Sequence, residues 1–237
     1  MFWYILILLI VLIGWLCLKM KKNKNIEGFE NQYDIYVITL KSEDRIKNIK
    51  EQQKKIDKPI QLFDAVNGNN LDLTKYDNIQ IDAFNNDKNQ YKREIGCYLS
   101  HYNIYKKCKK TGYTIVFEDD FLIDVENLIE KVNKSIEKLN NSNTDFDIMY
   151  LGNHSWNQSH GILIVDDLYK VGNGEGLGGT HAYVINNKNI DKIIKETSNI
   201  DRQIDVKIQF LADQNKLTVI KTYPYYVNTI DSASTIA

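Results

Sequence analysis

Three consecutive acids, Glu118, Asp119 and Asp120, directly follow the apolar run at 115–117. Such a run is typical of a strand buried on both faces of an α/β sheet, and buried strands present functional groups at their carboxyl ends. Crowded carboxylates repel one another and lose hydration there, which favours a cation, and hard divalent metals prefer oxygen ligands. Two other interpretations stay open: the acids cap the following helical segment, or they face solvent.

The segments before the acids predict a βαβ unit. Residues 33–40 are rich in β-branched and aromatic side chains and predict a strand. Ser42 is an expected N-cap of a helix that ends before Pro59, and a second strand follows at 60–63. This order predicts a parallel sheet with right-handed crossovers.

A helix is predicted from residue 93 through 108, with Gly112 as its C′ glycine. Ser100 and His101 lie among its apolar residues and need hydrogen-bond partners or a ligand. Glu94, Cys97 and His101 fall on one face beside the core stripe. For the single histidine, the pattern favours a structural role.

Five glycines between 172 and 179 precede Thr180, His181 and the predicted strand that contains them, 180–185. Because a strand follows this loop instead of a helix, the dinucleotide and P-loop fingerprints do not apply. A flexible loop over a sugar or diphosphate and a mobile connection without function both fit the composition. The other predicted elements are helices at 125–139, 188–196 and 204–211 and strands at 146–152 and 217–222.

Residues 1–18 carry no charged side chain and would span about 27 Å as a helix, close to the thickness of a bilayer core. This predicts a single-pass transmembrane anchor, followed by a polar linker at 19–32 and one globular domain at 33–237. A cleavable signal peptide is the rival, but a basic n-region is missing. Lysines after the span indicate a cytoplasmic domain, with a luminal placement as the alternative.

The composition is that of one globular domain with a short extra segment. The chain has 237 residues, of which 43% are hydrophobic and 26% charged, and its formal net charge is −1. Lysines are matched by acids and scattered, without the basic stripe that neutralises a phosphate backbone. Nucleic acid is therefore not an expected partner.

Several blocks of the sequence together resemble glycosyltransferase family 25, which contains lipooligosaccharide galactosyltransferases and collagen hydroxylysine galactosyltransferases. The resemblance covers roughly residues 33–236, and the block at 93–101 followed by the acids is its most specific part. The blocks, in chain order, are Tyr36-Val37-Ile38-Thr39-Leu40 with Arg45, Arg93-Glu94-Ile95-Gly96-Cys97-Tyr98-Leu99-Ser100-His101, Phe117-Glu118-Asp119-Asp120, Tyr150-Leu151-Gly152, Gly179-Thr180-His181-Ala182-Tyr183 and Asp205.

The resemblance implies a GT-A-like, Rossmann-type α/β domain with a mainly parallel sheet. It also implies transfer of a hexose, commonly galactose, from a UDP-sugar with inversion, assisted by Mn²⁺ or Mg²⁺. The acceptor would be a hydroxyl of a glycan, a lipid-linked saccharide such as lipooligosaccharide, or a protein. Two positions depart from the family pattern: Arg93 stands where a glycine is usual, and Asn228 where a glutamine is expected.

The resemblance also implies roles for individual residues. Asp120 is the expected metal ligand, and Glu118 or Asp119 would contact the metal or the ribose. Asp205 is the expected base for the acceptor hydroxyl, with Asp213 second. The expected donor-binding or substrate-binding residues are Thr39, Leu40, Arg45, Glu94, Ser100, His101, Glu118, Asp119, Gly179, Thr180 and His181.

Two other classes of function stay open. A catalytically silent module that binds a sugar nucleotide or a glycan would keep the same fold. A metal-dependent hydrolase or nucleotidyltransferase would use the same acids.

Overall fold

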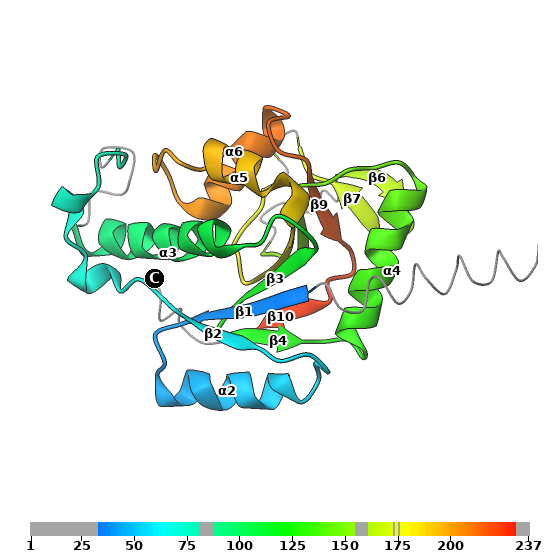
Figure 1. Ribbon diagram of the computed structural model, residues 1–237, viewed down its shortest axis with the longest axis horizontal. Coiled ribbons are helices and arrows are strands. Elements are labelled where there is room, and N and C mark those ends of the chain that lie inside the picture. Colours follow the sequence, from blue (N-terminus) through cyan, green and yellow to red (C-terminus); the bar gives the residue numbers. More distant parts are fainter. Residues whose placement is uncertain (1–32, 81–87, 155–160, 173, 175, 231–237) are drawn as a thin grey trace, which may run out of the picture. The chain divides into compact units, whose positions relative to one another are not determined.

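The computed structural model describes residues 33–80, 88–154, 161–172, 174 and 176–230 (Figure 1). The predicted anchor at 1–18 and linker at 19–32 lie outside these residues. Among the residues that are described, no helix combines the length and the apolar character needed to cross a membrane.

The predicted βαβ opening is confirmed. Strand β1 (Tyr33–Thr39) is followed by helix α2 (Glu43–Gln53) and strand β2 (Gln61–Asp64), and the two strands pair in parallel. Ser42 occupies the N-cap with an extended backbone, but its side chain makes no capping hydrogen bond. The first turn of α2 instead carries Glu43 and Asp44, whose charges suit a helix N-terminus.

The described strands form a main sheet in the order β2-β1-β3-β8-β5-β9-β7-β6, together with a small antiparallel pair, β10 and β4. The central strands of the main sheet are buried along nearly all of their length, so both faces of the sheet are covered there. Its remaining strands are β3 (Tyr113–Glu118), β5 (Ile148–Gly152), β6 (Ile162–Val165), β7 (Leu168–Lys170), β8 (Ala182–Asn186) and β9 (Val219–Thr222), and the small pair is β4 (Phe121–Ile123) with β10 (Val227–Thr229).

Strand β8 runs antiparallel to both of its neighbours, β3 and β5. The expectation of a mainly parallel sheet is corrected here, because the sheet is mixed: β1 pairs in parallel with β2 and β5 with β9, whereas β6, β7 and β9 pair antiparallel. The reason is the path of the chain. The glycine-rich segment delivers the chain to the carboxyl end of β3, so β8 begins there and runs back, with Ala182 opposite Phe117.

Helices cover the main sheet from both sides. Helix α3 packs against α5 and α6, and α2 packs against β4. Figure 1 shows α2 on the opposite side of the strands from α3, α5 and α6. A cluster of buried apolar residues joins alternate side chains of the strands, such as Ile38, Val116 and Tyr183, to the side covered by α3, α5 and α6. The helices are α3 (Lys88–Lys107), α4 (Leu128–Asn141), α5 (Ile190–Glu196) and α6 (Ile204–Asp213).

Several predicted boundaries are wrong. Helix α3 ends at Lys107, and Gly112 lies in the turn before β3 with a φ of 76°, so it is not a C′ glycine. Helix α4 begins at Leu128, later than predicted, because Asn127 takes a left-handed φ of 53°. The short strands β4, β6, β7 and β10 were not predicted, since three or four residues are too few for a clear period.

Candidate active site

The acids at 118–120 lie where β3 ends and the chain turns into β4. Asn48 on α2 fixes this turn, because its side-chain amide donates to the backbone oxygens of Asp119 and Phe121, both at 3.0 Å. Asp119 is buried and Asp120 nearly so, with side-chain exposures of 2% and 13%. The acids therefore neither face open solvent nor cap a helix, since α4 begins only at Leu128.

Arg45 brings a cation to these acids from the first turns of α2. Its side chain is 5% exposed, with Nε 3.5 Å from Asp119 Oδ1 and Nη1 3.9 Å from Asp120 Oδ2. A buried charge requires such a partner, since desolvation without compensation is costly. Arg45, a predicted donor-binding or substrate-binding residue, therefore lies beside two of the acids.

Glu118 is held from the other side by a hydrogen-bonded group on α3 and at the start of β8. The Thr180 hydroxyl donates to Glu118 Oε1 at 2.6 Å. His101 Nε2 lies 3.3 Å from the same oxygen and 3.1 Å from Thr180 Oγ1. The other ring nitrogen of His101 lies 2.7 Å from the Tyr183 hydroxyl, so this buried histidine is fully partnered.

The three acids differ in their electrostatics. Burial alone would raise the pKa of Glu118, but hydrogen bonding and charge from His101, with the Thr180 bond, lower it to about 2. Burial raises the pKa of Asp119, and the charge of Glu118 adds to this rise. Burial and then the charge of Glu118 raise the pKa of Asp120 to about 6, against the opposing charge of Arg45. Asp120 is therefore the acid of the three that most needs a further cation.

Two carboxylate oxygens in the site support that need. Asp119 Oδ2 and Asp120 Oδ1 are buried and have no hydrogen-bond partner among the described residues. Oxygen donors of this kind suit Mg²⁺ or Mn²⁺. Glu118 Oε1, by contrast, already accepts from Thr180. The donor set fits the predicted metal, and it favours Asp120 and Asp119 over Glu118 as ligands.

The glycine-rich segment is held along one face of α6. Three side chains spaced four residues apart accept hydrogen bonds from its backbone amides, so the segment runs antiparallel to the helix. This arrangement delivers the following Thr180 to Glu118. The pairs are Asp205 with Gly179 (2.8 Å), Gln209 with Leu177 (2.9 Å) and Asp213 with Gly174 (3.1 Å).

The two predicted bases occupy different ends of that helix. Asp205 accepts from Gly179, the neighbour of Thr180, and so borders the acidic site. Asp213 lies eight residues further on, about 12 Å along the helix, where it is exposed and also accepts from Gln209 at 2.7 Å. The structure therefore brings Asp205, but not Asp213, beside the acids.

Of the other predicted binding residues, Thr39 and Leu40 lie near the acids, whereas Glu94 and Ser100 make their hydrogen bonds elsewhere. Thr39 is the last residue of β1 and Leu40 follows it; hydrogen bonding from both opposes the rise in the pKa of Asp119, and Leu40 is 36% exposed. Glu94 accepts from Gln90 at 3.2 Å on the half-exposed part of α3. Ser100 is buried and does not belong with the acids: its hydroxyl accepts from Val66 and donates to Gly96.

His181 lies against Gly152, the last residue of β5. A Cβ at Gly152 would come within 2.3 Å of His181 Nε2 and 2.1 Å of the Val227 carbonyl oxygen, so only glycine fits there. The His154 ring lies 4.8 Å from that of His181. Burial lowers the pKa of His181 to about 4, against the charge of Glu118. His181 is therefore neutral near pH 7.

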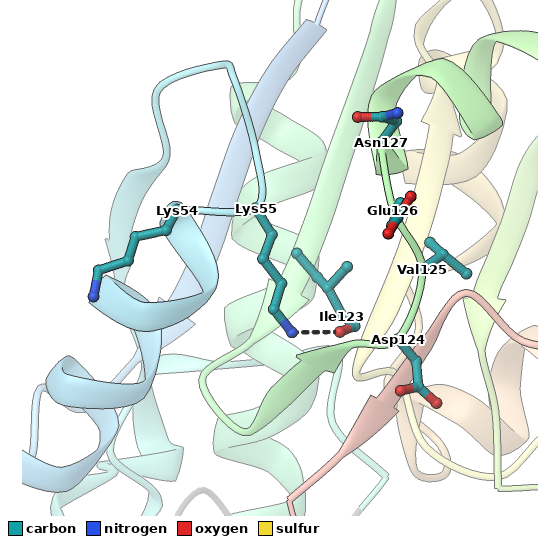
Figure 2. Close-up of a pocket in the computed structure, with 7 residues that line it drawn as sticks. All are labelled: Lys54, Lys55, Ile123, Asp124, Val125, Glu126 and Asn127. Carbon is teal, nitrogen blue, oxygen red and sulfur yellow. Dashed lines mark hydrogen bonds between the residues drawn. The ribbon is translucent and has the colours of Figure 1, made fainter.

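A separate hollow of about 520 Å³ lies between the end of α2 and the chain that follows β4. Figure 2 shows Lys55 reaching across it to the backbone oxygen of Ile123, at 2.7 Å. None of the predicted site residues lines it. The residues that do are Lys54, Lys55, Ile123, Asp124, Val125, Glu126 and Asn127.

The family model of glycosyltransferase family 25 (LPS biosynthesis protein) matches residues 32–208, which contain the acids, the Glu94–His101 block and Asp205. The chain belongs to glycosyltransferase family 25. The family resemblance found in the sequence is thereby confirmed.

Individual family 25 relatives match about half of the chain. Procollagen galactosyltransferase 1-A of Xenopus laevis is 29% identical over 128 residues, which are 50% of this chain and 21% of that protein. Procollagen galactosyltransferase 2 of Homo sapiens is 25% identical over 138 residues, 53% of this chain and 21% of that protein. Inactive glycosyltransferase 25 family member 3 of Mus musculus is 27% identical over 112 residues, 44% of this chain and 19% of that protein.

In each of these matches, the chain spans about a fifth of the length of the relative. Similarity of this extent supports a common domain. The activities and substrates in those names belong to the longer proteins.

Sequence reasoning missed Asn48, which fixes the acidic turn, and Gln52, whose side-chain oxygen accepts from the Ile123 amide at 3.0 Å. A signal for both was present. Arg45, Asn48 and Gln52 are spaced by three and four residues, so they form a polar stripe on one face of α2. Such a stripe on a helix that packs against a sheet indicates polar groups to be satisfied beneath it.

Proposed function

We propose that this family 25 chain is a metal-dependent glycosyltransferase. It would move a hexose, galactose by preference, from a UDP-sugar to an acceptor hydroxyl with inversion. The observation that carries the proposal is a pair of buried oxygens, on Asp119 and Asp120, that have no hydrogen-bond partner among the described residues, in a chain of this family. The names of the procollagen galactosyltransferases support galactose as the donor sugar.

Asp120 and Asp119 would hold Mn²⁺ or Mg²⁺, with Glu118 as a further ligand or a ribose contact. When bound, the metal would stabilise the negative charge that develops on the departing diphosphate. Arg45, on α2, offsets part of the negative charge of the two aspartates. Glu118 stays ionised because its pKa lies at about 2, so its carboxylate can accept hydrogen bonds from donor hydroxyls.

Inversion requires a base that takes the proton of the acceptor hydroxyl as the sugar is transferred, which contributes about 10²–10⁴ in rate. Asp205 is favoured over Asp213, because it borders the acids while Asp213 is exposed at the far end of α6. Each Asp205 oxygen already accepts one amide hydrogen, from Gly179 or Val206, and keeps a second lone pair for the acceptor.

The acceptor class is a glycan, a lipid-linked saccharide or a protein. The description of the family names LPS biosynthesis, and two of the relatives are named procollagen galactosyltransferases, so both saccharide and protein acceptors have support. An anchor at 1–18 with a cytoplasmic domain stays a prediction from the sequence. Protease treatment of sealed microsomes, whose outer face is the cytoplasmic one, tests it: digestion of the domain supports a cytoplasmic placement, and protection contradicts it.

A catalytically silent binding module is the second candidate. It is favoured by one observation, that a mouse relative in the same family is named inactive. Such a module would bind the nucleotide sugar without turning it over.

Hydrolysis and transfer assays with UDP-galactose and UDP-glucose, each with and without Mn²⁺, separate these functions. We expect Mn²⁺-dependent release of UDP, faster with UDP-galactose and increased by an acceptor. Asp120→Ala should reduce this turnover by about 10²-fold or more without unfolding the domain. Asp124→Ala is the matched control, because Asp124 is an exposed acid on the same segment. Donor binding without turnover would favour the silent module, and normal activity of Asp120→Ala would overturn its assigned role.

A further inference from the structure

Cys97, His101 and Glu118 bring a thiol, an imidazole and a carboxylate together at the edge of the acidic site. The cysteine sulfur, a histidine ring nitrogen and a carboxylate oxygen all lie within 4.8 Å of one another. Cys97 and His101 are four residues apart on α3 and therefore share a face. Glu118 reaches them from the end of β3, with His101 Nε2 3.3 Å from its Oε1.

Contacts of the adjacent face of α3 fix the rotation of the helix, so that Cys97 and His101 are presented to the acidic site. A Cβ at Gly96 would come within 2.6 Å of the Val66 carbonyl oxygen, so the helix lies directly against the chain after β2. Ser100, one turn later, accepts from the Val66 amide at 2.8 Å. With these two contacts in place, Cys97 and His101 are directed toward the end of β3.

His101 has the outer contact that a metal-binding histidine needs. Such histidines hold the second ring nitrogen against an oxygen, which fixes the ring and its tautomer. His101 Nδ1 lies 2.7 Å from the Tyr183 hydroxyl, and both residues are fully buried. With a cation on Nε2, Nδ1 keeps its proton and donates it to the Tyr183 oxygen.

The surroundings of the thiol favour a positive ion. A carboxylate oxygen of Glu118 lies within 4.8 Å of the sulfur, and Asp205 and Asp120 add negative charge around it. A divalent cation would complement these charges and displace the thiol proton to solvent as the sulfur binds.

We infer that Cys97, His101 and Glu118 form a second cation site that selects a thiophilic divalent metal, above all Zn²⁺. Sulfur, nitrogen and one carboxylate oxygen are zinc ligands, and three protein ligands leave one position open. The carboxylate oxygens of Asp119 and Asp120 instead favour a hard cation such as Mg²⁺ or Mn²⁺. On the proposed function, this second cation would also compete with Thr180 for Glu118 Oε1 and so lower the affinity for the UDP-sugar.

Cadmium tests the site directly, because its bond to a thiolate gives a charge-transfer absorption in the ultraviolet. Titration of the untagged, full-length protein with Cd²⁺ should saturate at one equivalent, and Zn²⁺ but not excess Mg²⁺ should remove the signal. Cys97→Ser should lose the signal. Cys108→Ser should keep it, and it is a matched control because Cys108 is a partly buried free thiol just beyond the same helix.

A measurement on the unmodified protein covers the case in which Cys97→Ser does not fold. Zn²⁺ should slow alkylation of Cys97 by iodoacetamide at least several-fold and leave Cys108 unaffected, as read by peptide mass spectrometry. An unchanged Cd²⁺ signal in folded Cys97→Ser, or equal alkylation of Cys97 with and without Zn²⁺, would overturn the inference. Neither measurement depends on sugar transfer, so this site and the proposed function can fail separately.

Discussion

Thr180 and Glu118 are 62 residues apart in the chain, yet the Thr180 hydroxyl donates to Glu118 Oε1 at 2.6 Å. The contact joins the end of β3 to the residue that leads into β8. It exists because β8 runs antiparallel to β3, so that the glycine-rich segment and the acids meet at one edge of the sheet.

Thr180→Val should destabilise the protein by about 1–3 kcal/mol at pH 7, because the partly buried Glu118 loses a hydrogen bond. The folded-state pKa of Glu118 is lowered to about 2, so its contribution to stability is present above its ordinary value of 4.5 and is lost as pH falls toward 2. The difference between variant and wild type should therefore shrink at acid pH. Urea unfolding at two pH values measures it. Thr180→Ser keeps the hydroxyl and should behave as wild type; an equal loss in both variants would refute the role of the bond.

The apparent affinity for Mn²⁺ should rise with pH up to about 6 and then level off. A metal requires the ionised form of Asp120, whose pKa is raised to about 6 by burial and by Glu118. Below that pKa, the affinity should change by about tenfold per pH unit if one proton is displaced. Calorimetric titration across this range measures the change. Affinity independent of pH in the wild type would contradict the assignment.

Asp120→Asn should gain stability relative to metal-free wild type as pH rises from about 4 to about 6. A carboxyl whose folded-state pKa is raised contributes stability at low pH, and that contribution is lost as pH rises through the raised pKa of about 6. The neutral amide has no such loss. Thermal unfolding with a chelator present measures the trend, with Asp124→Asn as the exposed control; a constant difference across the range would exclude this linkage.

Gly152→Ala should destabilise the fold by about 1–3 kcal/mol through overpacking. Its Cβ would come within 2.1 Å of the Val227 carbonyl oxygen and 2.3 Å of His181 Nε2, and the carbonyl belongs to a paired strand that cannot easily move. Gly172→Ala is the matched control, since its added Cβ would meet no atom of the described residues within 4 Å, and it should change stability by less than about 0.5 kcal/mol. Equal unfolding midpoints for the two variants would contradict this account.

Gln209→Ala should loosen the glycine-rich segment without unfolding the domain. The Leu177 amide loses its acceptor. Because a hydrogen bond contributes a net stabilisation of about 0.5–1.5 kcal/mol, we expect hydrogen exchange at this amide to be up to about tenfold faster. The KM for the donor should rise more than kcat falls. Gln203→Ala is the control, because Gln203 makes no capping hydrogen bond at the start of α6. Unchanged exchange at Leu177 would show that Gln209 does not hold the segment.

Much of the architecture could be predicted from local patterns. The strand before Glu118, the βαβ opening and the apolar stripe of α4 follow from periods of about two and 3.6 residues, which depend only on neighbouring residues. Short strands such as β4 carry too few residues for a period. The prediction that Gly112 ends the helix as a C′ glycine was wrong, because a glycine with positive φ occurs in turns as readily as at helix ends.

The sequence by itself determined that three acids end a buried strand, that His101 needs partners and that the chain resembles family 25, because each is a matter of residue type and spacing. Only the tertiary structure decided that β8 reverses direction and that Arg45 meets Asp119 and Asp120. It also decided that Glu118 Oε1 accepts a hydrogen bond, whereas one oxygen of each aspartate has no hydrogen-bond partner among the described residues. These contacts join residues far apart in the chain. They depend on the path of the chain between them, which no local pattern contains.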